Sequence, residues 1–175
     1  NVITNTKLLK CNEDNLELSN GTKIHHSFII FTGGIEASPI TSQLDVDKNG
    51  RGQILVNEYL QTNKYPNIFA IGDIAEIKNK KGEIMPPNVT VARISGTCAG
   101  KNILAMIKNK KMTPCDPKLE GILIALGGKY AAGNLYGLVH VKGRIAYEIK
   151  KYVFSSYRKP LLQLIKAGYK KLKKL

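Results

Sequence analysis

Short apolar runs separated by polar turns dominate the first 35 residues. Residues 6–10 and 15–18 predict two short strands, and the Asn20-Gly21 pair that follows is typical of a hairpin turn. Residues 28–31 form a continuous apolar run, which predicts a strand buried on both faces of a parallel sheet. Glycines at the end of such a strand let a ligand or another backbone come close, and a plain tight turn is the alternative. The residues at this end are Thr32, Gly33 and Gly34.

The middle of the chain changes from short strands to one long helix. After a polar connection over residues 36–53, residues 54–56 and 68–71 predict two further strands. The apolar residues between positions 88 and 109 recur at helical spacing and predict a helix of about 20 residues. Pro87 and Asn88 are suitable residues for its start, and the lysines that follow position 107 are suitable for its end.

The last third predicts a small β structure followed by helix. Residues 121–125, 130–135 and 138–141 are short β segments separated by glycines, and the period becomes helical from Lys142 onward. Pro160 predicts a break and therefore two helices. The second is expected to be amphipathic, with an apolar face opposite a basic one. The apolar face holds Leu161, Leu164, Ile165, Tyr169 and Leu172, and the basic face holds Lys166, Lys170 and Lys173.

Charge changes this picture because it is concentrated at one end. The formal net charge is +14, and residues 142–175 hold eleven basic residues against a single acid, Glu148. A localised basic segment predicts a polyanionic surface, either anionic lipid headgroups or nucleic acid, with a solubilising face as the alternative. An amphipathic basic helix favours the membrane surface, and we expect no nucleic acid. Docking on the protein's own core and a homodimer contact are the competing uses of this helix.

Composition excludes several other classes. The chain has 175 residues and 43% hydrophobic content, which is ordinary for a soluble α/β protein. Its three cysteines are widely spaced without a CxxC pair, so neither a zinc site nor a redox disulfide is indicated, and we expect no metal. No apolar stretch is long enough to cross a membrane, and the first residues lack the features of a signal peptide. The chain does not begin with Met, so we expect it to be part of something larger.

The candidate chemistry lies where the predicted strand over residues 68–71 ends at Gly72 and Asp73. A carboxylate at the carboxyl edge of a sheet can accept hydrogen bonds from vicinal hydroxyls of a ribityl chain or ribose. The helix that starts at Asn88 offers unpaired N–H groups and the positive end of its dipole, which suit a flavin that gains negative charge on reduction. A common Gly-Asp turn without a ligand is the alternative.

These residues carry a family resemblance over nearly the whole chain. Residues 52–73 (GQILVNEYLQTNKYPNIFAIGD) resemble the stretch that leads to the flavin-binding aspartate in pyridine nucleotide-disulphide oxidoreductases. Residues 29–34 resemble the return from their inserted NAD domain. The Pro86-Pro87 helix start, residues 113–128 and the basic tail are together similar to type II NADH dehydrogenases. The resemblance implies part of an α/β two-dinucleotide-binding fold that binds FAD and NAD(H) and passes electrons from NADH to a quinone, oxygen or another acceptor.

The resemblance also implies domains and residue roles. Residues 1–35 would end the NAD-binding domain, residues 36–112 would complete the FAD-binding domain, and residues 113–175 would form a small C-terminal domain. Gly72 and Asp73 would contact the ribityl and phosphate region of FAD. The isoalloxazine would lie beside Pro87, Asn88 and Val89, and the nicotinamide near Thr32, Gly33 and Gly34. Lys150 matches a catalytic position that faces the flavin in relatives, and a surface lysine is the alternative.

Two departures limit what the resemblance implies. Quinone-reducing relatives carry two glutamines in the first turns of the long helix, where this chain has Thr90 and Ile94, so the acceptor pocket differs. No GxGxxG fingerprint occurs, so we expect the phosphate-binding segments upstream of these residues and no activity from this chain alone. The expected location is cytoplasmic, with peripheral attachment to the cytoplasmic membrane face. The alternative function is a non-catalytic basic module that binds membrane or nucleic acid through its lysine-rich end.

Overall fold

The computed structural model describes residues 1–172, with the side chains of residues 159–161, 164 and 166–172 outside that description. The chain forms two compact units, which are Asn1–Ile35 and Glu36–Leu175. Most of the predicted amphipathic face of the C-terminal segment, including Leu161, Leu164, Tyr169, Leu172, Lys166, Lys170 and Lys173, lies outside the described residues.

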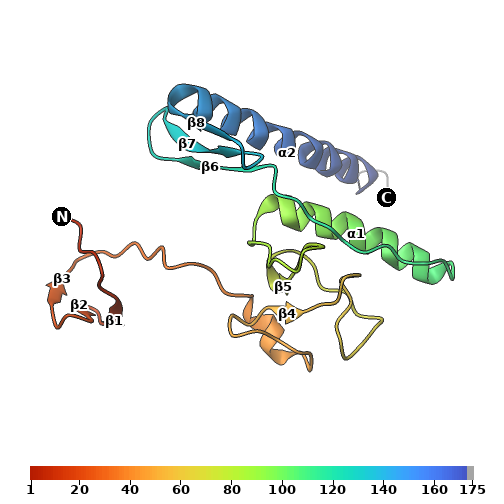
Figure 1. The fold of residues 1–175 in the computed structure, drawn as a ribbon, viewed down its shortest axis with the longest axis horizontal. Helices are drawn as coiled ribbons and strands as arrows, with labels where there is room; N and C mark the ends of the chain where they lie inside the picture. Colours follow the sequence, from red (N-terminus) through yellow and green to blue (C-terminus); the bar gives the residue numbers. More distant parts are fainter. Residues whose placement is uncertain (173–175) are drawn as a thin grey trace. The chain divides into compact units, whose positions relative to one another are not determined.

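The first unit is a three-stranded antiparallel sheet (Figure 1). Its strands are β1 (Leu8–Cys11), β2 (Asn15–Leu18) and β3 (Lys23–His25), in the order β1-β2-β3. The predicted turn joins β2 to β3, because Gly21 has a φ of +83° and its N–H donates to the Leu18 carbonyl at 2.9 Å. The two strands expected here are confirmed, although β1 begins at Leu8, two residues later than predicted.

The strand predicted over residues 28–31 is not formed. Its side chains are exposed, with Phe28 at 81%, Ile30 at 77% and Phe31 at 73% of their full accessible area. A strand in a parallel sheet needs hydrogen-bonding neighbours, and no described residue pairs with this segment. The prediction was wrong for this chain because such a strand needs partner strands. None of residues 1–172 supplies a partner for this apolar run.

Three similar asparagine turns shape the start of the second unit. In each, an asparagine side-chain oxygen accepts hydrogen bonds from the backbone N–H groups two and four residues later, at 2.9–3.0 Å. The asparagines are Asn49, Asn57 and Asn79. The residue three positions after each of them has a left-handed backbone, with φ values of +72°, +70° and +78°. These turns are the Asx type, in which a short polar side chain replaces a backbone acceptor.

A small parallel pair and a buried cluster follow from these turns. Strand β4 (Ile54–Leu55) pairs with β5 (Ala75–Glu76). The strand predicted over residues 68–71 is reduced to one bridge, between Phe69 and Gln61, before the short helical turn η2 (Gly72–Ile74). The core packs apolar residues from the turns, strands and long helix together. Its buried members are Ile54, Leu60, Ala70, Ala75, Ile77, Met85, Val91, Ala99 and Cys115.

The long helix α1 (Val89–Ile107) confirms its prediction. Asn88 caps it, because its side-chain oxygen accepts the Val91 N–H at 2.9 Å. Farther along, the buried Asn102 fixes the chain that leaves the helix: its Nδ2 donates to the carbonyls of Tyr59 and Thr113, and its Oδ1 accepts the Thr113 N–H. Residues 113–119 are thereby held alongside α1.

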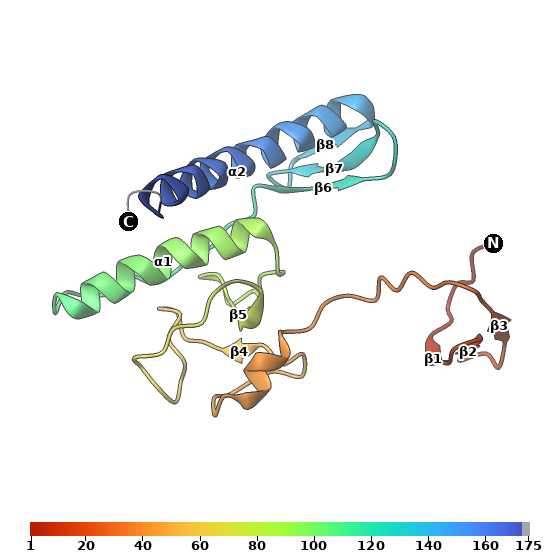
Figure 2. The same cartoon turned by 180° about the vertical axis from the view of Figure 1, so that it is seen from behind.

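The C-terminal part is an antiparallel sheet with a helix on one face (Figures 1 and 2). Strands β6 (Gly121–Ala125), β7 (Ala131–Leu135) and β8 (Val139–Lys142) lie in chain order, and α2 (Gly143–Leu172) packs against all three. Ala131 and Ala146 are fully buried at this contact. The three β segments predicted here are confirmed, and three of their six ends are shifted by one residue.

The predicted break at Pro160 does not occur. Helix α2 runs without interruption from Gly143 to Leu172. Proline removes one N–H from the helix and strains one turn. The flanking residues are mostly good helix formers such as lysine, leucine, glutamine and alanine, which support continuation on both sides. Among the described residues, no helix has the length and apolar character needed to cross a membrane.

Candidate functional site

The Gly72-Asp73 turn is held against the first turns of α1. The Gly72 N–H donates to the Ser95 Oγ at 3.1 Å, and the Ser95 hydroxyl donates in turn to the Ala92 carbonyl at 3.0 Å. Gly72 has a φ of +66°, and a Cβ at this position would lie 3.6 Å from the Ala92 Cβ. A side chain here would therefore be strained by the backbone and would fill the space against the helix, which explains the glycine.

Asp73 is fixed through its backbone and free at its carboxylate. Its carbonyl accepts from the Gln53 Nε2 at 3.1 Å, and Gln53 is held by the Asn49 Nδ2, which donates to its Oε1 at 3.0 Å. Gln53 is 8% exposed, whereas Asp73 is exposed. Within the described part of the chain, the Asp73 carboxylate has no hydrogen bond or ion pair. It can therefore accept hydrogen bonds from hydroxyl groups of a ligand.

The start of α1 completes this first site. Asn88 and Pro87 are half-buried, Val89 is 61% exposed, and the first N–H groups of the helix point out of its end. The structure therefore brings four of the predicted residues, Gly72, Asp73, Asn88 and Val89, to the first turns of one helix. Unpaired N–H groups and the positive end of the dipole favour a ligand that carries or gains negative charge there.

A second pocket lies between α1, the β6-β7 strands and α2, and it has a volume of about 160 Å³. Thr90 comes from the first turn of α1, and Lys150 comes from the second turn of α2. The Lys150 Nζ donates to the Leu123 carbonyl at 2.6 Å. The structure thus brings Thr90 and Lys150, for which the sequence predicted separate roles, to one pocket. The complete lining is Thr90, Glu120, Gly121, Leu123, Leu135, Lys150, Val153 and Tyr157.

Tyr157 bridges the two helices at this pocket. Its hydroxyl lies 3.2 Å from the Thr90 Oγ1, and the Arg93 guanidinium lies 5.7 Å from the centre of its ring. Helix α1 is therefore in contact with two different structures. Its Ala92 and Ser95 side packs against Gly72, while its Thr90 and Arg93 side meets Tyr157.

Other predicted residues are not brought to these sites. Ile94, assigned to the acceptor pocket, does not line it and packs instead against the buried core. Thr32, Gly33 and Gly34 lie at the end of the first unit. Their roles and those of the remaining predicted residues stay predictions.

Sequence reasoning missed three residues that support the sites: Gln53, Ser95 and Tyr157. The first two act through hydrogen bonds to residues about 20 positions away in the chain, which no local pattern reveals. Tyr157 did leave a signal. Lys150, Val153 and Tyr157 follow one another at intervals of three and four residues, so they share one face of a helix.

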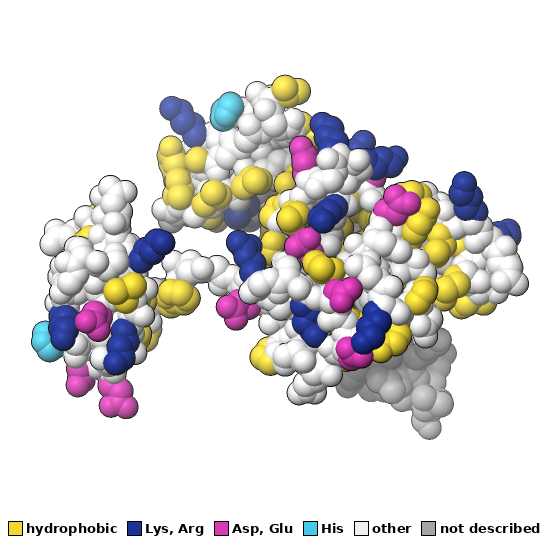
Figure 3. Space-filling view, turned by 60° about the horizontal axis from the view of Figure 1, so that its bottom comes forward, with side chains coloured by type: hydrophobic (Ala, Val, Ile, Leu, Met, Phe, Trp, Pro, Cys, Tyr) yellow, Lys and Arg dark blue, Asp and Glu magenta, His cyan; other side chains and the backbone are white. Residues whose placement is uncertain are grey.

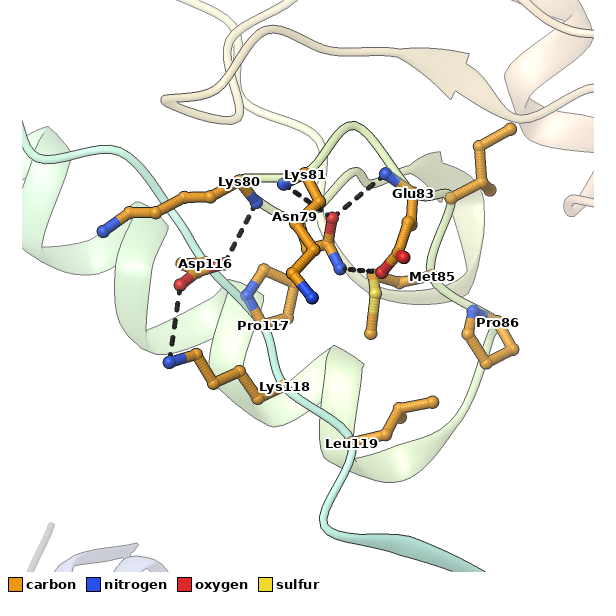
Figure 4. Close-up of a pocket in the computed structure, with 11 residues that line it drawn as sticks. Asn79, Lys80, Lys81, Glu83, Met85, Pro86, Asp116, Pro117, Lys118 and Leu119 are labelled. Atoms are coloured by element: carbon orange, nitrogen blue, oxygen red, sulfur yellow. Dashed lines mark hydrogen bonds and ion pairs between the residues drawn. The ribbon is translucent and has the colours of Figure 1, made fainter. Parts of the chain in front are cut away.

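A larger pocket, of about 510 Å³, lies elsewhere (Figure 4). It is formed by the Asn79 turn and the segment 116–119, and none of the predicted site residues lines it. Several of its polar groups pair with one another: Asp116 accepts the Lys80 N–H at 3.0 Å and pairs with Lys118 at 3.8 Å. Asn79 likewise donates to Glu83 at 2.6 Å. We therefore interpret it as the surface of a stabilised turn.

The three cysteines differ in their burial. Cys11, Cys98 and Cys115 are all free. Burial, together with a hydrogen bond and charge repulsion from Cys98, raises the pKa of the Cys115 thiol to about 12. A thiol that holds its proton so strongly is a poor nucleophile at neutral pH. Cys115 is therefore a core residue.

Sequence comparison relates the chain to flavin-dependent reductases. Residues 1–96 match the family described as pyridine nucleotide-disulphide oxidoreductase. The chain is 32% identical over 136 residues to the type II NADH:quinone oxidoreductase of Haemophilus influenzae, a match that covers 77% of this chain and 31% of that protein. It is 31% identical over 135 residues to the demethylphylloquinone reductase NdbB of Synechocystis, covering 77% of this chain and 33% of the relative. The chain thus spans about a third of the length of these relatives.

Solved structures share the fold. A sulfide:quinone oxidoreductase from Aquifex aeolicus superposes with a TM-score of 0.59 at 18% identity, covering 89% of this chain and 40% of that one. An NAD-dependent persulfide reductase from A. fulgidus superposes with a TM-score of 0.57 at 21% identity, covering 76% of this chain and 25% of that one. At this level of identity the likeness concerns the fold alone, and it supports an α/β architecture.

Proposed function

Because this chain belongs to the pyridine nucleotide-disulphide oxidoreductase family and is of the type II NADH dehydrogenase-like kind, we propose that it is part of a FAD-dependent enzyme. The whole protein passes electrons from NADH through FAD to a second acceptor of the quinone class. The observation that carries this proposal is the Gly72-Asp73 turn, which is pinned to the start of α1 and leaves its carboxylate free.

The residues of the turn and helix fit a bound FAD. Asp73 would accept hydrogen bonds from the ribityl hydroxyls of FAD, and Gly72 gives the turn its left-handed backbone. The backbone at Pro87, Asn88 and Val89 would lie by the isoalloxazine, where the dipole of α1 would stabilise negative charge. When bound, FAD would accept a hydride, which is a proton with two electrons, from NADH. Gln53 and Ser95 act as positioning residues for this turn.

The chain contains only part of the machinery. Residues 1–35 end the NAD-binding domain and place Thr32, Gly33 and Gly34 near the nicotinamide. Residues 36–112 belong to the FAD-binding domain, and residues 113–175 form a small third domain. Neither phosphate-binding fingerprint occurs in these 175 residues. The grip on the pyrophosphate of each cofactor therefore comes from residues outside them.

The second electron transfer uses the pocket between α1 and α2. Lys150 places a positive charge and N–H donors at its wall, which favours an acceptor whose oxygen atoms gain negative charge on reduction. Thr90 lines the same pocket, whereas Ile94 packs against the buried core. The names of the two bacterial relatives support a quinone as this acceptor.

The C-terminal helix supports attachment to an anionic membrane surface. Tyr152 and Phe154 are 76% and 68% exposed on α2, and the segment carries most of the positive charge of the chain. Exposed aromatic rings among basic residues are typical of helices that lie in the headgroup region. We place the protein at the cytoplasmic face of the membrane, where a quinone dissolved in lipid can reach it. A homodimer contact through α2 would use the same surface.

The direct test is the flavin itself. The full-length protein, purified and supplied with FAD, should show visible flavin absorption bands that survive removal of free FAD. Anaerobic addition of NADH should bleach these bands, and subsequent addition of a quinone should restore them. A protein that retains no flavin, or whose flavin is not bleached by NADH, would overturn the proposal.

A further inference from the structure

We propose that Tyr157 determines the acceptor specificity of this pocket, by donating a hydrogen bond to a carbonyl oxygen of a single-ring quinone. The inference rests on the proposed function, because it names the class of molecule that occupies the Thr90 and Lys150 pocket. It goes further in assigning the recognition to a residue of α2 and in limiting the size of the ring.

The hydroxyl of Tyr157 is held in place by α1. It lies 3.2 Å from the Thr90 Oγ1, so one of the two hydroxyls donates to the other. When Thr90 donates, the Tyr157 proton is free for a ligand in the pocket that both residues line. The Arg93 guanidinium also lies 5.7 Å from the centre of the ring, within cation–π range. A donor fixed in this way loses little conformational entropy when a ligand binds.

Lys150 provides a second donor at a different place in the pocket. Its ammonium group carries three N–H donors, and one of them is used by the Leu123 carbonyl. Lys150 and Tyr157 are seven residues apart on α2, which separates their Cα atoms by about 10 Å along the helix axis. Two donors that project from positions two turns apart suit a ligand with carbonyl oxygens on opposite sides of a ring.

Apart from Glu120, which is exposed, the remaining side chains of the lining are apolar, and the space is small. Leu123, Leu135 and Val153 surround a volume of about 160 Å³. A cavity of about 150 Å³ in another protein is known to hold benzene. This pocket therefore holds one six-membered ring, and the second ring of a naphthoquinone would project from its mouth. Apolar walls with a few placed donors are the usual composition of a small-molecule site.

The pocket is also well placed for electrons that leave the flavin. Thr90 and Ala92 lie about 200° apart around a helix of 3.6 residues per turn, so they occupy nearly opposite sides of the first turns of α1. Ala92 contacts Gly72, and Thr90 contacts Tyr157. The flavin turn and the acceptor pocket thus share the first turns of α1 as their common wall.

The experiment measures binding of a short-chain benzoquinone to the oxidised, FAD-loaded full-length protein by quenching of the flavin fluorescence. Loss of one hydrogen bond in Tyr157→Phe should weaken this binding about fivefold to tenfold. The control is Tyr152→Phe, which loses the same atom from an exposed position on the same helix and should bind like the wild type. A naphthoquinone with the same side chain should bind more weakly than the benzoquinone to the wild type.

Three results would overturn the inference in different ways. Equal benzoquinone affinity in Tyr157→Phe and wild type would remove Tyr157 from the site and leave the proposed function intact. Tighter binding of the naphthoquinone would contradict the size limit. Failure of NADH to bleach the wild-type flavin would overturn the proposed function and this inference together. A flavin absorption spectrum of Tyr157→Phe that matches the wild type establishes that the variant is folded.

Discussion

At the scale of single residues, the three asparagine turns show how the second unit balances backbone strain against burial. The left-handed position is occupied by Gly52 and Gly82 in two turns and by Leu60 in the third. A non-glycine residue at positive φ is strained by about 1 kcal/mol or more. Leu60 is nevertheless 1% exposed and lies in the core cluster. Burial of its side chain stabilises the fold by more than the backbone strain costs.

This balance makes an unusual prediction for Leu60. Replacement by alanine should lower the free energy of unfolding by about 2–5 kcal/mol, because a cavity remains. Glycine removes one more carbon but relieves about 1 kcal/mol of strain. Leu60→Gly should therefore be at least as stable as Leu60→Ala, as measured by urea denaturation of the purified protein. Gly82→Ala is the matched control. It has open space around the new Cβ and should lose stability through the backbone alone.

A glycine variant that is clearly less stable than the alanine variant would show that Leu60 is not strained. That result would also remove the common explanation for the three turns. The three turns would still share the asparagine hydrogen bonds and the left-handed backbone.

At the scale of elements, local signals predicted the local structures. The Asn20-Gly21 hairpin, the helix that starts at Asn88 and the three strands after position 120 depend on residues close together in the chain, and all were confirmed. Two strand predictions failed because partner strands decide them: residues 28–31 have no partner among the described residues, and residues 68–71 keep only the bridge between Phe69 and Gln61. The predicted break at Pro160 failed for a local reason, because the residues on both sides of the proline are mostly good helix formers.

The candidate sites divide in the same way. Gly72 and Asp73 end one sequence motif, and Pro87 and Asn88 mark the start of α1, so the sequence alone proposed them as candidates. Thr90 and Tyr157 are separated by 67 positions, and only the packing of α1 against α2 brings them together. Gln53 and Ser95 likewise contact the Gly72-Asp73 turn through tertiary hydrogen bonds. A sequence pattern can therefore propose candidate residues more readily than it reveals the residues that hold them in place.

At the scale of the whole molecule, charge and exposed apolar groups have distinct distributions. Figure 3 shows hydrophobic, basic and acidic side chains interspersed on one face. The excess of positive charge nevertheless belongs to residues 142–175, which also expose Tyr152 and Phe154 on α2. Coulomb attraction to anionic lipid decays within about 10 Å at 0.1 M salt, whereas burial of aromatic rings does not depend on salt in this way. The two contributions can therefore be separated.

The full-length protein should float with vesicles that contain anionic lipid and should be released as the ionic strength rises. Phe154→Ser should weaken vesicle binding about tenfold or more, because a buried phenylalanine contributes about 1.5–3 kcal/mol. The control is Tyr136→Ser, which removes an aromatic ring that is similarly exposed, at 69%, but lies between β7 and β8. Equal flotation of the wild type, Phe154→Ser and Tyr136→Ser would contradict attachment through α2. Flotation with neutral vesicles but not with anionic ones would contradict it as well.

Asp73 is the residue proposed to hold the flavin, and the affinity of the protein for FAD is the direct measure of that role. In the full-length protein, Asp73→Ala should raise the dissociation constant for FAD about 10-fold to 100-fold, the range expected for loss of charge-assisted hydrogen bonds. Asp47→Ala removes another exposed carboxylate of the same unit and should leave the constant unchanged. An Asp73→Ala protein that binds FAD as tightly as the wild type would contradict the account.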